Sequence, residues 1–130
     1  MLMISLISLV CGFLIYIFLR EGTYIHSIID TILEIDVQSL NYEYHFFFDL
    51  LKYYIVDFLW CFSLLCSLSA IWYEQGKKSI LIISMISVGA GVLYEIAQAY
   101  DMINGTADLV DILMYIFAGV FHAIIYKTIF

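Results

Sequence analysis

Apolar residues dominate four stretches of the chain, and short polar segments separate the last three of them. The stretches cover about residues 2–19, 54–73, 79–100 and 107–126. Each approaches the roughly 20 residues with which an α-helix crosses about 30 Å of hydrocarbon. The connections after the second and third stretches are short, and both contain glycine, which breaks helices. The pattern therefore predicts an all-α fold, a four-helix transmembrane bundle in which the last three helices are adjacent and antiparallel.

The segment 20–53, between the first two spans, has a different pattern. Isoleucine and leucine recur at helical spacing over residues 23–35, while polar and charged residues occupy the opposite face. This pattern predicts a short amphipathic helix that lies in the membrane interface. The tyrosines and phenylalanines that follow are typical of the headgroup level, so we expect the second span to enter the membrane near Tyr54.

Composition supports a membrane protein, because 65% of the residues are apolar and the mean hydropathy is strongly positive. The net charge is −7, and most of the acidic residues lie between or at the ends of the apolar stretches.

The lysines and the arginine predict the membrane topology. Two lysines follow the second span and one follows the fourth, whereas Arg20 and Lys52 lie on the other side. This small majority predicts an N-in, C-in topology in which every acid except Glu74 lies outside. The chain has no basic patch, so we expect no nucleic-acid partner.

Small and polar residues recur every three or four positions, so that they share one face of a helix in three of the spans. The stripes are Ser5, Ser8, Gly12, Tyr16 and Arg20 in the first span, Ser84, Ser87, Gly91, Glu95 and Gln98 in the third, and Asp108, Asp111, Tyr115, Ala118 and His122 in the fourth. The second span adds Asp57 near its outer end. An isolated charge in hydrocarbon costs at least about 2.5 to 3.5 kcal/mol. We therefore expect the stripes to face inward, with His122 as a hydrogen-bonded packing residue far from the acids.

Seven residues form the candidate polar cleft near the outer leaflet. They are Arg20, Asp57, Glu95, Gln98, Thr106, Asp108 and Asp111. One arginine cannot neutralise four carboxylates, so we expect at least one acid to be protonated near pH 7 or to bind a cation. A divalent cation is the only cofactor that this set of side chains suggests.

Local capping gives an alternative explanation for part of this cluster. Asp108 and Asp111 fall in the predicted first turn of the fourth span, where the helix dipole favours carboxylates, and Thr106 is the predicted N-cap. Asn104 and Gly105 are predicted to end the third span. Under this alternative, the acids near the fourth span stabilise the helix and bind nothing.

Four short motifs resemble the VanZ-like family of small bacterial membrane proteins. They are GFLIYIFLR closing the first span, DFLW opening the second, YEIAQ ending the third and GTADLVD opening the fourth. The resemblance implies a single VanZ-like domain over residues 1–130, in a multi-pass protein of the bacterial cell membrane that is linked to resistance to teicoplanin-type lipoglycopeptide antibiotics. The family's recurrent polar positions match the seven cleft residues. The chain departs from the family at Val56, where proline is frequent, and at Tyr115, where asparagine is common.

Three functions remain open at this point. In the first, which we favour, a non-enzymatic cleft binds the head group of a membrane lipid, a cell-wall precursor or a lipoglycopeptide antibiotic. The second is a metal-assisted enzyme that acts on a lipid-linked cell-wall precursor or a phospholipid. In it, Glu95 or Asp57 would be the general acid/base, and Asp108 and Asp111 would hold the cation. Against this function, no nucleophile paired with a base stands out. The third is a proton-linked membrane subunit, for which the serine and glycine stripes would build a homo-oligomer.

Overall fold

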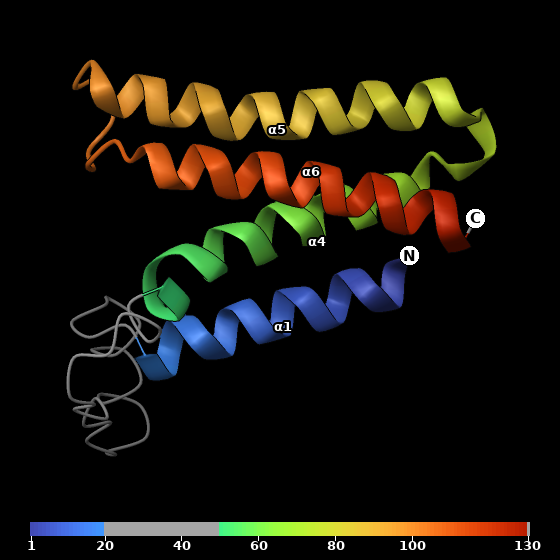
Figure 1. Ribbon diagram of the computed structural model, residues 1–130, viewed down its shortest axis with the longest axis horizontal. Helices are drawn as coiled ribbons and strands as arrows, with labels where there is room; N and C mark the ends of the chain where they lie inside the picture. The colour runs from blue at the N-terminus through green and yellow to red at the C-terminus, as the bar shows by residue number, and fades with distance from the viewer. Residues whose placement is uncertain (20–49, 130) are drawn as a thin grey trace.

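The computed structural model describes residues 1–19 and 50–129, and these contain four α-helices (Figure 1). The helices are α1 (Leu2–Leu19), α4 (Val56–Ile71), α5 (Lys77–Ala99) and α6 (Leu109–Ile129). A π-helical turn, η1 (Leu50–Ile55), leads into α4, and a 3-10 turn, η2 (Tyr73–Gln75), follows it. The described residues contain no strand, which confirms the all-α prediction for this part of the chain. The predicted interfacial helix at 23–35 lies outside the described residues.

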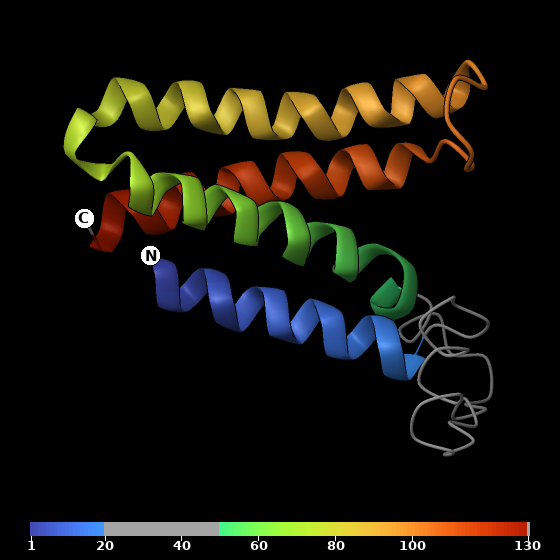
Figure 2. The ribbon, with the colours of Figure 1, turned by 180° about the vertical axis from the view of Figure 1, so that it is seen from behind.

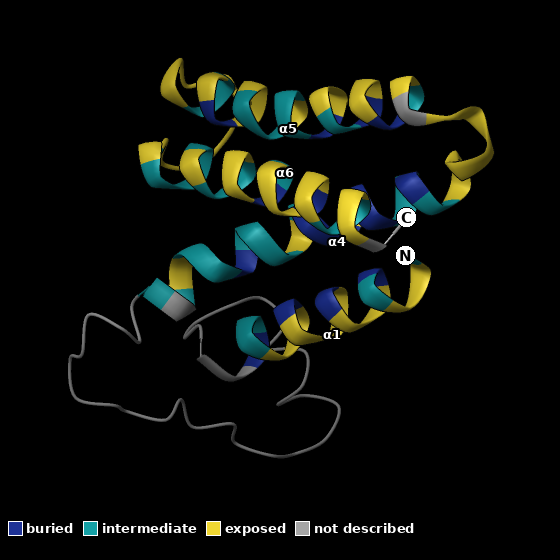
Figure 3. Ribbon diagram, turned by 45° about the vertical axis from the view of Figure 1, so that its right-hand side comes forward, coloured by how far each residue is buried: buried dark blue, intermediate teal, exposed yellow. Residues whose placement is uncertain are grey.

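Three helical segments are long and apolar enough to span a membrane, namely Lys52–Ile71, Lys78–Ala99 and Leu109–Thr128. The α1 helix is also apolar but has only 18 residues, which corresponds to about 27 Å at 1.5 Å per residue. Its role as a fourth span stays a prediction. Large apolar side chains cover the outer surface of α5 and α6, as lipid-facing helices require (Figure 3); examples are Leu81, Met85, Ile86, Leu93, Phe117 and Ile124.

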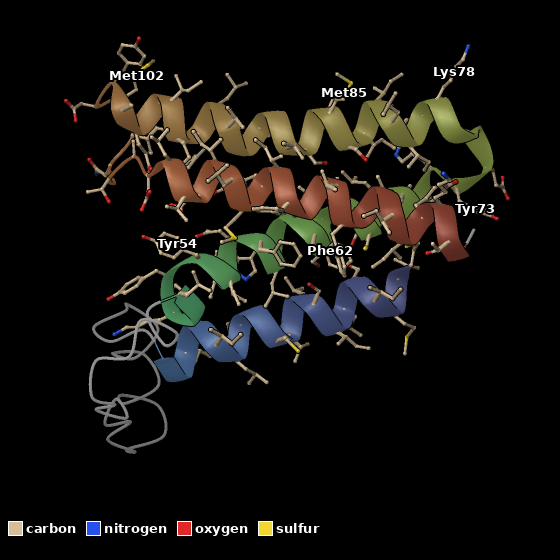
Figure 4. The ribbon with its side chains drawn as sticks, in the orientation of Figure 1. Tyr54, Phe62, Tyr73, Lys78, Met85 and Met102 are labelled. Carbon is tan, nitrogen blue, oxygen red and sulfur yellow. The ribbon has the colours of Figure 1, made fainter. Side chains whose placement is uncertain are left out.

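The α4 helix lies at the centre of the bundle, where it packs on α1, α6 and α5, and α5 also packs along α6 (Figures 1 and 2). Both chain termini and the α4–α5 connection lie at one end, and the α5–α6 connection lies at the other (Figure 1). We call the first the basic end, because it includes Lys78, which Figure 4 labels, and Lys127 in the last turn of α6. We call the second the acidic end, because Asp108 lies there, directly before α6. Which end faces the cell exterior stays a prediction.

The predicted stripe of small residues on α1 is the surface that packs against α4. Ser5 and Ser8 are buried there. The Ser5 hydroxyl donates to the Ser63 carbonyl and the Ser63 hydroxyl donates to the Ser5 carbonyl, each over 2.9 Å. The Ser8 hydroxyl donates to a backbone carbonyl of α4 over 3.0 Å. A Cβ at Gly12 would lie 2.9 Å from the Trp60 ring, so glycine is needed for this close approach.

The middle of the bundle holds a small apolar core and one buried histidine. The core residues are Phe62, which Figure 4 labels, Leu65, Cys66 and Ala118. The Nε2 atom of His122 lies 2.8 Å from the Ser69 hydroxyl, and its Nδ1 atom lies 3.4 Å from the Ser84 hydroxyl. Because both ring nitrogens have serine partners, the prediction that His122 is a hydrogen-bonded packing residue is confirmed.

Candidate functional site at the acidic end

The C-terminus of α5 is closed by its own backbone. The N–H groups of Met102 and Asp101 bond back to carbonyls in the last turn of the helix, over 2.9 and 3.0 Å, which is the Schellman arrangement. Asp101 takes the left-handed conformation that this motif needs, with φ at 53°. The prediction that Asn104 and Gly105 end the helix is therefore wrong. Aspartate can substitute for glycine here because its short polar side chain tolerates left-handed φ.

Gly105 instead allows the α5–α6 loop to pack closely against the Gln98 side chain. Its φ is 147°, and a Cβ at this position would collide with the side-chain amide of Gln98. Only glycine satisfies both conditions. Gln98, one of the predicted cleft residues, is half-buried beneath the loop.

Asp108 is the N-cap of α6. Its Oδ1 atom accepts a hydrogen bond from the Val110 backbone N–H over 2.8 Å, and its Oδ2 atom accepts one from the Tyr54 hydroxyl over 3.1 Å. Tyr54 belongs to η1 and lies at the acidic end in Figure 4, so Asp108 ties α6 to the start of α4. The prediction that Thr106 caps this helix is wrong, since α6 begins two residues later than expected and Thr106 is exposed in the loop.

Glu95 is buried, with 4% of its surface exposed, and its carboxylate receives two hydrogen bonds. The Asp108 backbone N–H donates to Oε2 over 3.1 Å, and the Tyr115 hydroxyl donates to Oε1 over 3.5 Å. The first distance is ordinary and the second is at the limit for a hydrogen bond, so the backbone donor contributes more. Glu95 thus fastens the last turns of α5 to the start of α6.

The Tyr115 hydroxyl interacts electrostatically with acids from three helices. A Cβ at Gly91 would lie 2.7 Å from the Tyr115 ring, so the absence of a side chain there lets the ring lie across α5. The carboxylates of Asp57, Glu95 and Asp111 all lie near enough to the Tyr115 hydroxyl to interact with it electrostatically. Acids of α4, α5 and α6 therefore all act electrostatically on one hydroxyl.

Beside Tyr115 lies a cavity of about 230 Å³ between α4, α5 and α6, which we call the acidic cavity. Its lining includes Asp57, Trp60, Cys61, Ser87, Tyr94 and Tyr115. Only 5% of Ser87 is exposed, and within the described residues its hydroxyl has no hydrogen-bond partner. A buried polar group without a partner costs about 1 to 3 kcal/mol. A molecule in the cavity that bonds to Ser87 would remove this cost.

A larger cavity of about 770 Å³ lies between α5 and α6, nearer the basic end. Its lining is mostly apolar and includes Gly89, His122 and Lys127. None of the six candidate cleft residues that the structure describes lines it. Beyond the backbone of its own helix, a Cβ at Gly89 would have none of the described residues within 4 Å, so this groove has room for a larger side chain.

The candidate residues thus lie in different places. Glu95 and Asp108 hold α5, α6 and η1 together, and Gln98 lies beneath the α5–α6 loop. Asp57 lines the acidic cavity, and Asp111 is half-buried and lies near enough to Tyr115 to interact with its hydroxyl. Thr106 is exposed, and Arg20 lies outside the described residues. In the described part of the chain, no three His, Cys, Asp or Glu side chains gather closely enough to hold a metal ion.

Sequence reasoning missed two donors in this network, the Tyr54 hydroxyl and the Asp108 backbone N–H. Tyr54 stands in the aromatic-rich approach to the second span, which was a usable signal for a residue at the membrane interface. The backbone donor has no signal in the sequence, because every residue except proline carries the same N–H.

No protein-family model, curated protein or solved structure matches this chain. The resemblance to VanZ-like proteins stays a prediction from the four motifs.

Proposed function

We propose that this protein binds the head group of a membrane lipid or a lipid-linked cell-wall precursor in the acidic cavity. The supporting observation is the buried Ser87 hydroxyl, which lacks a partner among the described residues and lines the same cavity as Asp57 and Tyr115. Buried polar groups in folded proteins normally have hydrogen-bond partners. A head group that enters the cavity would complete the bonding of Ser87 and place its own polar atoms beside a carboxylate.

The volume of the cavity favours a head group over a large ligand. Pockets for drug-sized molecules measure about 300 to 1,000 Å³, and the acidic cavity measures about 230 Å³. A lipoglycopeptide antibiotic is much larger than such a drug and does not fit inside. If the protein confers resistance to teicoplanin-type antibiotics, it would therefore do so by binding a membrane component in the cavity, and not by enclosing the antibiotic.

The lysines support placing the acidic end at the outer leaflet of a bacterial cell membrane. Lys78 and Lys127 belong to the basic end, and positively charged residues favour the cytoplasmic side. With this orientation, the acidic cavity lies within reach of outer-leaflet lipids and of the lipid carriers of cell-wall precursors.

Mass spectrometry of the lipids that remain bound to the purified protein tests this proposal. Asp57→Asn and Ser87→Ala each remove one polar group from the cavity. Glu74→Gln and Ser79→Ala remove the same kinds of group at the basic end, where Glu74 is exposed and Ser79 bonds to a nearby backbone carbonyl. We expect wild type and both controls to retain the same lipid species and both cavity variants to lose it. Identical retention in all five proteins would contradict the proposal.

The link to resistance needs its own assay. In bacteria that express the protein at equal levels, we expect Asp57→Asn to abolish any protection against teicoplanin that wild type gives, and Glu74→Gln to preserve it. If the Asp57→Asn protein loses the lipid in the first assay but still protects the bacteria fully, then head-group binding is not the cause of the resistance.

A further inference from the structure

We infer that the head group bound in the acidic cavity is a primary ammonium carried by a membrane amphiphile. This inference rests on the proposed function, and it adds the charge, the hydrogen-bonding character and the source of the ligand. The cavity combines the features that recognise an organic cation. Its lining includes three aromatic side chains, one carboxylate and one buried hydroxyl.

The aromatic side chains are Trp60, Tyr94 and Tyr115, and each comes from a different helix. The face of an aromatic ring attracts a cation within about 6 Å of its centre, and groups of such rings are a recurrent binding site for organic ammonium ions. A cation between these rings would contact α4, α5 and α6 together. The Tyr115 ring packs directly against the α5 backbone at Gly91.

The charges around the cavity also favour a cation. Among the residues that the structure describes, Asp57 is the only charged one in the lining, and no described lysine, arginine or histidine lines it. Glu95 and Asp111 lie near enough to Tyr115 to interact with its hydroxyl. An anionic group placed beside Tyr115 would meet like charges from α4, α5 and α6, whereas a cation would be attracted by all three.

Ser87 distinguishes between kinds of ammonium. A primary ammonium carries three N–H donors and no acceptor, and a serine oxygen has lone pairs that accept such bonds. The hydroxyl of Ser87 lacks a partner among the described residues, so its oxygen is available to this donor. A quaternary ammonium has no N–H and would leave Ser87 unpaired. The cavity should therefore prefer the primary form.

The mouth of the cavity indicates that the ligand comes from the membrane. Trp60, Leu64 and Tyr94 line the cavity and are 42%, 46% and 47% exposed. All three belong to segments long and apolar enough to span a membrane. The cavity thus opens sideways onto a surface that lipid would cover, and an alkyl chain attached to the ammonium can remain in the hydrocarbon.

Tryptophan fluorescence tests the inference, because the chain has two tryptophans and only Trp60 lines the cavity. Trp72→Phe leaves Trp60 as the single reporter, and Trp60→Phe leaves Trp72, which lies at the other end of α4. In maltoside micelles, dodecylammonium should change Trp60 fluorescence saturably and leave Trp72 fluorescence without a saturable change. On the Trp72→Phe background, we expect Asp57→Asn and Ser87→Ala each to weaken binding by about tenfold, and Glu74→Gln to have no effect.

Three further probes separate the outcomes. Dodecyltrimethylammonium should bind more weakly than dodecylammonium, and equal binding would overturn the preference for a primary ammonium. If dodecanol binds saturably and dodecylammonium does not bind, the inference of an ammonium ligand is wrong. The proposal that the cavity binds a head group would then still stand. Butylammonium that binds as tightly as dodecylammonium would overturn the membrane source. If neither dodecylammonium nor dodecanol gives a saturable Trp60 signal, both the inference and the proposed function are wrong.

Discussion

Replacement of Glu95 tests the network that joins α5 to α6. The Glu95 carboxylate is 4% exposed and accepts the Asp108 backbone N–H over 3.1 Å. Hydrogen bonds to charged groups contribute about 1.5 to 3 kcal/mol, and neutral ones contribute about 0.5 to 1.5 kcal/mol. Glu95→Gln keeps one oxygen that can accept the backbone bond, so we expect it to lower the free energy of unfolding by about 1 kcal/mol. Glu95→Ala leaves the donor without a partner, and we expect a loss of about 2 to 3 kcal/mol.

The measurement is equilibrium unfolding in mixed micelles, followed by the far-ultraviolet circular dichroism of the helices. Glu74→Gln is the matched control, because Glu74 is exposed and its neutralisation should change stability by less than about 0.5 kcal/mol. A Glu95→Ala protein as stable as wild type would refute the reasoning, since a buried carboxylate that holds two elements together cannot be removed without loss.

A double-mutant cycle separates the two donors to Glu95. The Tyr115 hydroxyl is 3.5 Å from Oε1, which is the limit for a hydrogen bond. We therefore expect a coupling energy below about 0.5 kcal/mol between Glu95→Gln and Tyr115→Phe. A coupling well above that value would show that Tyr115, and not the backbone of Asp108, is the main donor.

The same unfolding assay tests three further features of the acidic end. Asp108→Ala should cost about 1 to 2 kcal/mol because it removes the N-cap of α6, whereas Asp108→Asn should keep most of that stability; equal losses would contradict the capping role. Gly91→Ala should cost about 1 to 3 kcal/mol, since its Cβ would lie 2.7 Å from the Tyr115 ring. Gly89→Ala, with open space around its Cβ, should be neutral or should stabilise by up to about 1 kcal/mol, and the reverse order of these two variants would refute the packing argument. Asp101→Gly should stabilise by about 0.5 to 1 kcal/mol, because glycine adopts left-handed φ without strain, and a loss of stability would contradict this.

The sequence was sufficient to predict the four described helices and, for α1, α5 and α6, the face that packs inward. The spacing of Ser5, Ser8 and Gly12 depends only on helical periodicity, and these residues do pack on α4. The expectation that Asp57 and Glu95 lie near one another followed from the cost of leaving charges in lipid. Both carboxylates lie near enough to Tyr115 to interact electrostatically with its hydroxyl. These predictions were reliable because they rest on periodicity and burial, which a single sequence records.

The details of the site were not predictable, because they depend on contacts between segments. Thr106 and Asp108 are both good capping residues, and only the position at which α6 begins decides between them. The sequence placed Ser87 on the inner face of its helix but had no signal for a cavity beside it or for the lack of a partner. Helical periodicity predicts which face of a helix a residue occupies. Only the folded structure identifies the residues that it contacts on the neighbouring helices.

If a membrane-derived head group occupies the acidic cavity, a side chain that fills the cavity should displace it. Ser87→Leu places an apolar side chain in the cavity, and Gly89→Leu places the same side chain in the larger groove between α5 and α6. The measurement is the molar amount of lipid retained by each purified protein, after circular dichroism has shown equal helix content. We predict that Ser87→Leu loses a lipid species that both wild type and Gly89→Leu retain. The same lipid species in the same amount in all three proteins would contradict the account.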